Sequence, residues 1–337
     1  MNQRGCARAA VFSAGSWGTA VAKILADAGT DVIVHARRGE IADAINTHHR
    51  NPGYFPDIAL PAALTATTDP AAALAGADFL VLSIPAQTLR TNLAAWATQI
   101  GPGTVIVSLM KGIEQSSHLR ASQIITEVTG VSADRVAVLS GPNLAREIMD
   151  GQPAAATVAC PDEDSARRFQ QACHTSYFRP YTSTDVTGCE LGGAVKNVIA
   201  LATGIADGMG LGYNATAMLI TRGLAETTRL ATAMGAHPAT LAGLAGLGDL
   251  VATCTSPLSR NRTFGIHLGR GMSVEEATAA TRQTTEGVKS AEAILALAHV
   301  HDVEMPITNV ISALLHEKVT LNQAAAALMQ RPTKPER

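Results

Sequence analysis

The sequence predicts an α/β fold, in which a doubly wound, Rossmann-type parallel sheet is followed by an all-helical second half. Before about residue 185, short runs of β-branched and apolar residues alternate with amphipathic stretches, whereas helical runs and glycine-rich turns dominate afterwards. Strands that alternate with helices form parallel sheets covered on both faces. The chain has 337 residues, which is enough for two domains of roughly 100–200 residues each.

Six runs in the first half have the length and apolar composition of buried strands. These runs are Ala9–Phe12, Asp31–His35, Phe79–Ser83, Thr104–Ser108, Val136–Ser140 and Ala155–Ala159. The amphipathic stretches between them predict helices that cover the sheet, and they include Thr19–Ala28, Thr88–Gln99 and Ser117–Val128. We therefore expect one α/β domain over residues 1–187.

The second half is predicted to be an all-helical domain over residues 188–330. Its clearest helical runs are Thr216–Met234, Ser273–Thr281, Lys289–His299 and Leu321–Gln330. The charged, proline-containing tail at residues 331–337 is expected to be disordered.

Composition limits the classes to which the protein can belong. Hydrophobic residues make up 47% of the chain and charged residues 16%, so a substantial core can form. The net charge of −2 gives no reason to expect a nucleic-acid partner, which would need a basic surface. The five cysteines are scattered and form no C-x-x-C pair, so they indicate neither a disulfide framework nor a zinc site. We expect no bound metal.

The chain also lacks the patterns of a secreted or membrane-spanning protein. Residues 1–8 lead into the first strand without a cleavable apolar stretch. The apolar run at residues 197–206 is far shorter than the ~20 residues that a spanning helix needs. We expect a cytoplasmic protein without a membrane span, and a homodimer.

A glycine-rich turn follows the first predicted strand. Ser13, Gly15 and Gly18 occupy the three glycine positions of the G-x-G-x-x-G dinucleotide fingerprint, with serine at the first. The second glycine lets the backbone approach a pyrophosphate, and the third lets the helix pack close to the sheet. The next helix offers its N-terminal N–H groups to phosphates. An ordinary strand-to-helix turn is the alternative, but the position in the first βαβ unit favours a nicotinamide dinucleotide.

The end of the second strand bears on which cofactor is bound. An NAD-specific site usually carries an acidic residue there, which binds the ribose hydroxyls. This sequence instead has His35 and Ala36 followed by Arg37 and Arg38. Two arginines suit a 2′-phosphate, so we expect NADP(H) to be accepted, with NAD(H) as the other cofactor. The alternative is that both arginines are solvated charges at a helix start.

Two lysines lie where a cation can do chemistry. Lys111 follows a predicted strand directly, and the carboxyl ends of parallel strands line the ligand crevice. Lys196 is the only charged residue between Glu190 and Asp207, in a run of small and apolar residues. Burial of an ammonium group is costly unless it is paired, so Lys196 is a candidate proton donor and acceptor. A lysine that extends to the surface is the alternative.

A second isolated charge lies further along the helical half. Asp249 is the only charged residue between Arg229 and Arg260, with histidine counted as neutral, and we expect it to pair with Lys196. Ser259, Arg260 and Asn261 then form a compact set of hydrogen-bond donors. Such a set suits a phosphate group, because arginine can bind two of its oxygens at once.

These segments together resemble the bacterial-type glycerol-3-phosphate dehydrogenase (NAD(P)+) family over nearly the whole chain. The segments that carry the resemblance are residues 15–20 (GSWGTA), 111–114 (KGIE), 140–142 with 145–147 (SGP and ARE), 194–200 (AVKNVIA), 246–250 (GLGDL) and 254–262 (CTSPLSRNR).

The resemblance implies roles for individual residues. Lys196 is implied to be the proton acceptor for glycerol 3-phosphate oxidation. The implied substrate-site residues are Lys111, Gly141, Asn143, Lys196, Asp249, Ser259, Arg260 and Asn261. The implied cofactor contacts are Ser16, Trp17, Arg37, Lys111, Ala145, Arg260, Thr284 and Glu286, with Arg38 as an addition.

Three positions depart from the family pattern. Ser13 replaces the first glycine, so the phosphate turn is expected to be less tight. Asn143 and Leu144 stand where the family has serine or threonine and then phenylalanine. Thr284 occupies a cofactor-contact position that is usually apolar.

The expected reaction is direct hydride transfer between nicotinamide and C2 of the substrate, which reduces dihydroxyacetone phosphate to sn-glycerol 3-phosphate for phospholipid synthesis. Lys111 and Lys196 would polarise the ketone, and Lys196 would supply the proton. One alternative is a dehydrogenase of the same architecture that acts on a β-hydroxy acid or a sugar-acid phosphate. Another is a non-catalytic dinucleotide sensor, which would leave Lys196 and Asp249 without a purpose.

Overall fold

The computed structural model describes residues 6–281 and 286–330. The chain divides into two compact units, which we call the sheet unit (Met1–Lys111 and Leu119–Glu190) and the helical unit (Gly112–His118 and Leu191–Arg337). The predicted disordered tail at residues 331–337 and the predicted cofactor contact Thr284 lie outside the described residues.

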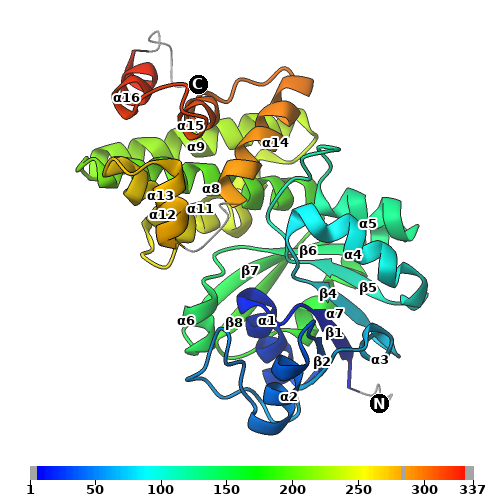
Figure 1. Cartoon of the computed structure of the whole chain (residues 1–337). Helices are drawn as coiled ribbons and strands as arrows, with labels where there is room; N and C mark the ends of the chain where they lie inside the picture. Colours follow the sequence, from blue (N-terminus) through cyan, green and yellow to red (C-terminus); the bar gives the residue numbers. More distant parts are fainter. Residues whose placement is uncertain (1–5, 282–285, 331–337) are drawn as a thin grey trace. The chain divides into compact units, whose positions relative to one another are not determined.

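The sheet unit is built on eight strands in the order β3-β2-β1-β4-β5-β6-β7-β8 (Figure 1). The strands are β1 (Arg8–Phe12), β2 (Asp31–His35), β3 (Thr65–Thr67), β4 (Phe79–Leu82), β5 (Val105–Ser108), β6 (Val136–Ser140), β7 (Ala154–Ala159) and β8 (Phe178–Ser183). The strand order reverses at β1, because β2 and β3 lie on one side of it and β4 to β8 on the other. Ligands of open α/β sheets bind at such a reversal.

This architecture confirms the predicted fold class, with one correction to the sheet. Strands β1 to β6 are parallel, but β7 runs antiparallel to β6. The link between β6 and β7 contains only the five-residue helix α6 (Ala145–Met149), and a parallel crossover usually needs a longer helix. Strands β3 and β8 were not predicted, since β3 has three residues and β8 is a half-exposed edge strand with an internal proline.

Helices cover both faces of the sheet. They are α1 (Ser16–Asp27), α2 (Gly39–His48), α3 (Pro70–Leu74), α4 (Leu89–Trp96), α5 (Ala121–Thr129), α6 and α7 (Glu163–Ala172), with short turns η1 (Ala86–Thr88), η2 (Ala97–Gln99) and η3 (Ala133–Arg135). Successive strand residues enter opposite cores, as when Val11 packs in one cluster and Phe12 in the other. An apolar cluster covers each face of the sheet, which explains the continuous apolar runs in the sequence.

The helical unit contains only helices among its described residues. They are α8 (Val186–Gly208, which begins in the sheet unit), α9 (Tyr213–Ala233), α10 (Pro238–Leu241), a π-helical turn η4 (Leu244–Gly248), α11 (Asp249–Thr255), α12 (Arg260–Gly269), α13 (Val274–Thr281), α14 (Glu286–Val300), α15 (Pro306–Leu315) and α16 (Leu321–Met329). Figure 1 shows α9 alongside α8, and a Cβ on Gly223 of α9 would lie 2.7 Å from Ile199 of α8.

Helix α8 is the central element of this unit, and glycines let α12 approach it closely. A Cβ on Gly204 would lie 2.1 Å from the Arg262 carbonyl oxygen, and one on Gly265 would lie 2.3 Å from the Leu201 carbonyl oxygen. These positions therefore exclude any side chain. The close approach brings the N-terminus of α12 beside the middle of α8, where Lys196 lies.

Helix α8 is longer than the apolar run that the sequence suggested. It has 23 residues and is apolar enough to cross a membrane by length and composition alone. Its most apolar window is 94% buried inside the protein, as expected of a core helix. The bent pair formed by residues 238–255 and α12 passes the same test of length and composition.

Candidate active site

The turn between β1 and α1 has the geometry of a phosphate-binding loop. Ser13 has a φ of 130°, a conformation that favours the glycine usually found there. Its Oγ accepts a hydrogen bond of 3.1 Å from the Gly15 N–H. A Cβ on Gly18 would lie 2.1 Å from the Ser13 carbonyl oxygen, so only glycine fits. No side chain caps α1, which leaves its N-terminal N–H groups for an anion.

A cavity of about 220 Å³ adjoins this turn within the sheet unit. It is lined by residues from the ends of β1 and β2, from the turn at Tyr54 and from the segment that leads into α4. The His35 ring stacks on Phe12 at 4.6 Å, and Trp96 packs edge-on against both rings. Burial lowers the pKa of His35, so its ring is neutral at neutral pH and forms an uncharged wall.

Arg37 and Arg38 both line this cavity. Arg37 is exposed and makes no ion pair or hydrogen bond through its side chain with any residue that the structure describes. The residues present therefore fit a dinucleotide: the turn suits a pyrophosphate, the aromatic wall suits a base, and the arginines suit a phosphate at the edge.

Further along the same carboxyl edge of the sheet, Lys111 and Gly141 lie together in the segments that follow the parallel strands β5 and β6. The Lys111 Nζ donates a hydrogen bond of 2.9 Å to the Gly141 carbonyl oxygen. Gly141 has a φ of 147°, and a Cβ there would lie 2.9 Å from the Ala156 Cα. A glycine is required for the β6–α6 turn to pass this close to β7. Ala145, another predicted contact, is the first residue of α6.

Several polar atoms around this turn are buried without a hydrogen-bond partner in the described structure. They are the Ser140 Oγ, both amide atoms of Asn143 and, in α1, the Trp17 Nε1. An unpaired buried polar group costs about 1–3 kcal/mol, so these atoms require a ligand or water. Ser140 was missed by the sequence reasoning; the available signal was a hydroxyl at the carboxyl end of an apolar strand.

In the helical unit, side chains from α8 and α11 form a buried cluster that contains two charged residues. The Lys196 Nζ donates to the Asp249 Oδ1 at 2.6 Å and to the Thr253 Oγ1 at 2.8 Å. The Thr253 hydroxyl donates in turn to the Asp249 carbonyl oxygen at 2.6 Å. The side chains of Lys196 and Asp249 are 10% and 1% exposed. The expected pairing of the two isolated charges is therefore present.

Among the described residues, this arrangement leaves one N–H of the Lys196 ammonium group without a partner. An ammonium has three N–H donors, and Lys196 uses two of them on Asp249 and Thr253. Thr253 was not predicted as a site residue. The signal for it was a hydroxyl four residues after Asp249 on the same helix, which places both on one face.

The residues that were predicted to bind the substrate phosphate lie at the N-terminus of α12. The Ser259 Oγ caps the helix by accepting from the Arg262 N–H at 3.3 Å. The Asn261 Nδ2 donates to the Asn197 Oδ1 at 3.1 Å, which ties this helix end to the residue beside Lys196. Asn197, buried in α8, was also missed by the sequence reasoning.

The two arginines of this segment differ in their partners. Arg262 is paired with Asp207 at 2.8 Å. Arg260 is exposed and has no side-chain partner within residues 6–281 and 286–330. Arg260 is therefore the cation that is free to bind an anion at this helix N-terminus.

The predicted site residues thus fall into one group in each unit. Ser16, Trp17, Arg37, Arg38, Lys111, Gly141, Asn143 and Ala145 belong to the sheet unit, and Lys196, Asp249, Ser259, Arg260 and Asn261 belong to the helical unit. Glu286 is the first residue of α14, and its side chain is outside the described structure. Within the described ranges, no group of three His, Cys, Asp or Glu side chains could hold a metal ion.

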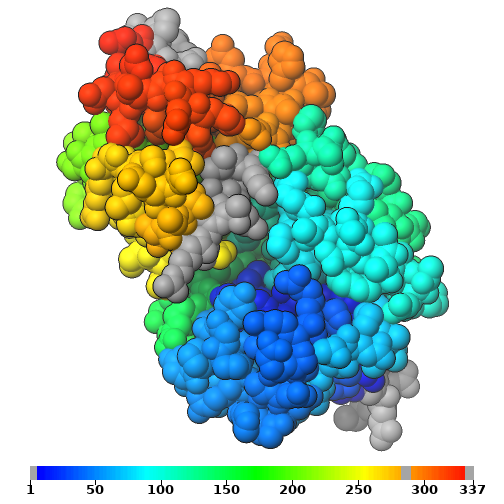
Figure 2. All heavy atoms as spheres, in the orientation of Figure 1, coloured from blue at the N-terminus to red at the C-terminus, as the bar shows by residue number. Residues whose placement is uncertain are grey.

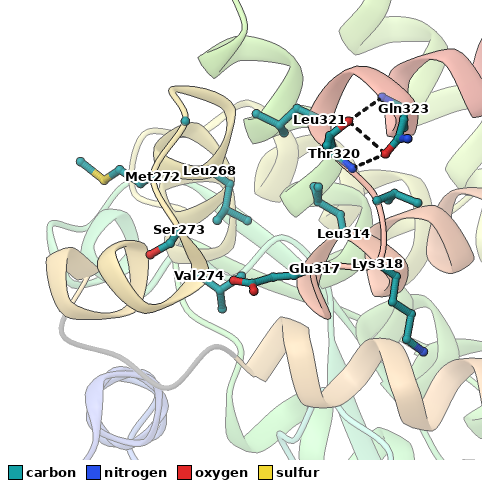
Figure 3. A pocket seen from close by; sticks show the side chains of 12 residues that line it. Leu268, Met272, Ser273, Val274, Leu314, Glu317, Lys318, Thr320, Leu321 and Gln323 are labelled. Atoms are coloured by element: carbon teal, nitrogen blue, oxygen red, sulfur yellow. Dashed lines mark hydrogen bonds between the residues drawn. The ribbon is translucent and has the colours of Figure 1, made fainter.

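The helical unit has a further cavity, of about 310 Å³, that contains no predicted site residue. Figure 2 shows its two walls side by side, α12–α13 in yellow and orange and the C-terminal helices in red. Figure 3 shows Thr320 and Gln323 joined by hydrogen bonds that cap α16. The remaining charged groups of this cavity, Glu317 and Lys318, are both exposed.

Comparisons with known proteins agree with this geometry. Residues 8–166 match the model of the NAD-dependent glycerol-3-phosphate dehydrogenase N-terminus, and residues 185–326 match that of the C-terminus. The chain is 63% identical over 330 residues to the glycerol-3-phosphate dehydrogenase [NAD(P)+] of Streptomyces griseus, covering 98% of each chain. It is 62% identical over 331 residues to the protein of the same description in Thermobifida fusca, again covering 98% of each.

Solved structures give the same result. The glycerol-3-phosphate dehydrogenase of Coxiella burnetii superposes with a TM-score of 0.91 at 37% identity, over 97% of this chain and 99% of that one. A D-mandelate dehydrogenase, with a TM-score of 0.61 at 15% identity over 94% of this chain and 99% of that one, shares the fold alone. The chain belongs to the NAD-dependent glycerol-3-phosphate dehydrogenase family.

Proposed function

We propose that this protein catalyses the reversible, NAD(P)-dependent reduction of dihydroxyacetone phosphate to sn-glycerol 3-phosphate. The observation that carries the proposal is the buried Lys196, which is held by Asp249 and Thr253 and has one N–H that no other described residue accepts. The Asn261–Asn197 hydrogen bond links the residue next to Lys196 to the end of α12, where the Arg260 side chain has no partner in the part of the chain that the structure describes. A proton donor and a phosphate binder are therefore joined in one compact unit.

The sheet unit supplies the cofactor half of the reaction. When bound, the reduced nicotinamide supplies a hydride to C2 of the substrate. We assign the pyrophosphate to the turn at Ser16 and Trp17, and the adenosine end to the cavity beside Arg37 and Arg38. The remaining cofactor contacts, which are part of the proposal, are Lys111, Ala145, Arg260, Thr284 and Glu286.

The helical unit supplies the proton. As hydride reaches C2, the ketone oxygen gains negative charge, and Lys196 Nζ gives it a proton to form the hydroxyl group. Asp249 stabilises the ammonium before transfer, and Thr253 holds the lysine in one orientation. Arg260 and Asn261 hold the substrate phosphate, which reduces the entropic part of the barrier. Lys111 polarises the ketone, and Gly141, Asn143 and Ser259 complete the substrate contacts.

The wider setting is also part of the proposal. The product would enter phospholipid synthesis, and the protein would act in the cytoplasm as a homodimer. We further propose that the functional domains are residues 1–187, which bind the dinucleotide, and residues 188–330, which bind the substrate.

The test is loss of reduced-nicotinamide absorbance when the purified protein receives dihydroxyacetone phosphate. We expect turnover with this substrate, and specificity constants at least roughly a hundredfold lower with the keto forms of a β-hydroxy acid or of a sugar-acid phosphate. A preference for one of those compounds would refute the substrate assignment. Dinucleotide binding without turnover of any of them would instead indicate a sensor.

A further inference from the structure

We propose that Glu40 sets the balance between NADPH and NADH by acting as a counter-ion to Arg38 at the adenosine end of the cofactor site. The inference rests on the cofactor-binding part of the proposed function. It adds a residue that lies outside the G-x-G-x-x-G turn and outside the arginine pair itself.

The first step is the location of the charge. Glu40 lies in the first turn of α2, two residues after Arg38, which is the N-cap of that helix. The Arg38 Nη1 and the Glu40 Oε1 are 3.6 Å apart. Arg38 lines the cavity of about 220 Å³, so the carboxylate lies next to the guanidinium that faces a bound nucleotide.

The second step is the direction in which Arg38 extends. A Cβ on Gly53 would lie 3.5 Å from the Arg38 Nη2, so the guanidinium reaches the turn before Tyr54, another cavity residue. The Nη1 atom of Arg38 therefore lies near Glu40, and its Nη2 atom lies near Gly53. The side chains of Arg38 and Glu40 are 61% and 69% exposed, which leaves the guanidinium open to a ligand and also screens the pair with solvent.

The third step is the charge that a 2′-phosphate would meet. Arg37 and Arg38 contribute two positive charges, and Glu40 removes one. His35 adds none at neutral pH, because burial lowers its pKa. A 2′-phosphate, with a charge of about −1.5 to −2 at pH 7, therefore meets a net charge near +1 and not +2.

This arrangement distinguishes the two cofactors without excluding either. A 2′-phosphate is attracted by the arginines and repelled by the carboxylate. A ribose 2′-hydroxyl is neutral, and an acidic side chain can accept its hydrogen bond. Glu40 thus lowers affinity for the phosphorylated nucleotide and leaves the unphosphorylated one unaffected or better bound. We therefore expect the site to bind both NADP(H) and NAD(H).

The test measures binding with probes that need no substrate. Calorimetric titration with 2′,5′-ADP and with ADP compares the two adenosine ends on the whole folded protein. We expect Glu40→Gln to bind 2′,5′-ADP about three- to tenfold more tightly than wild type, and ADP within twofold. At about 1 M salt the gain should fall below twofold, because charge interactions are then screened within about 3 Å.

The matched control is Asp43→Asn, which removes the same charge from the same helix. Neither Glu40 nor Asp43 lines the cavity, and both are exposed. Within the described residues, however, Asp43 forms no ion pair with Arg38 as Glu40 does, so its removal should change 2′,5′-ADP binding less than twofold. Glu40→Gln should also raise the ratio of kcat/KM for NADPH to that for NADH by a similar three- to tenfold. In a protein that already carries Arg38→Gln, adding Glu40→Gln should give little of this gain, because the carboxylate then has no arginine to neutralise.

The inference is overturned if Glu40→Gln changes 2′,5′-ADP affinity less than twofold, or if Asp43→Asn gives an equal gain. It is also overturned if wild-type protein binds neither nucleotide. Failure to turn over dihydroxyacetone phosphate, with the binding differences intact, would refute the proposed reaction and leave the role of Glu40 standing.

Discussion

The arginines at the end of β2 and the lysine in α8 lie in opposite environments: the arginines are exposed to solvent, and the lysine is buried and paired. The side chain of Arg38 is 61% exposed, with an acidic neighbour at 3.6 Å. Lys196 is 10% exposed, with Asp249 at 2.6 Å and Thr253 at 2.8 Å. A charge that only recognises a ligand can stay in solvent and remain free. A charge that must exchange a proton is buried and held in place by the protein.

The energetic consequences differ accordingly. Exposed ion pairs contribute little to folding and are weakened by salt. Removal of one partner from a buried pair leaves an uncompensated charge, which is strongly destabilising. Substitutions in the first group should therefore alter ligand binding alone, whereas those in the second should alter chemistry and stability together.

The largest effect is expected for Lys196→Met. The change keeps the aliphatic length and removes the proton donor, so turnover should fall by about 10²–10⁴-fold while nucleotide affinity remains. Steady-state kinetics and calorimetric titration on one preparation give both values. Lys318→Met, at an exposed position in the same unit, should keep wild-type turnover. If a folded Lys196→Met protein kept more than a tenth of wild-type turnover, Lys196 would not be the proton donor.

The next effect is on stability. Asp249→Asn leaves the Lys196 ammonium without its counter-charge and should lower the free energy of unfolding by about 3–5 kcal/mol. The double variant Lys196→Met with Asp249→Leu removes both charges and should recover more than half of that loss. Arg38→Gln should leave the unfolding free energy unchanged. Urea titrations measure all three, and equal losses for Asp249→Asn and Arg38→Gln would contradict the contrast.

Substrate affinity provides the third comparison. Arg260→Ala should reduce kcat/KM for dihydroxyacetone phosphate roughly ten- to a hundredfold, because a charge-assisted contact of about 1.5–3 kcal/mol is lost. Arg262→Ala is the control, since Arg262 is already paired with Asp207 and should change kcat/KM less than threefold. If the two variants behave alike, Arg260 does not bind the substrate phosphate.

A smaller effect concerns the phosphate turn. Ser13 is held at a φ of 130°, and such strain costs about 1–3 kcal/mol. Ser13→Gly relieves it but loses the hydrogen bond to the Gly15 N–H, so the net gain in unfolding free energy should be about 1 kcal/mol. Ser13→Ala keeps the strain and loses the bond, so it should be less stable than wild type. A Ser13→Gly protein that unfolds more easily than wild type would show that the turn is not strained.

The same contrast explains what sequence reasoning found and missed. Gly15 and Gly18 were recognised because a motif has fixed spacing, and Lys196 and Asp249 because a charge in an apolar helix is unusual. Thr253 carries only the weaker signal of a hydroxyl four residues after Asp249, and Asn197 carries none, since it matters only through a contact with a distant part of the chain. The Asn197–Asn261 bond, for example, depends on how α12 packs on α8.

The sheet shows a similar division. Strands with continuous apolar sequence were predicted close to their observed bounds, because both faces are buried. Strand β8, with alternating exposed residues and Pro180, depends on pairing with β7, which local composition does not encode. The antiparallel direction of β7 likewise follows from the short connection after β6, not from the residues of the strand.

The central claim is direct hydride transfer to C2 of dihydroxyacetone phosphate, with the proton supplied by the protein. The most direct test uses reduced cofactor that carries deuterium at both hydrogen positions on C4 of the nicotinamide ring, with mass spectrometry and NMR of the product. We predict glycerol 3-phosphate that carries one deuterium atom, bonded to C2. Cofactor oxidation that leaves no deuterium at C2, or gives no glycerol 3-phosphate, would contradict the account.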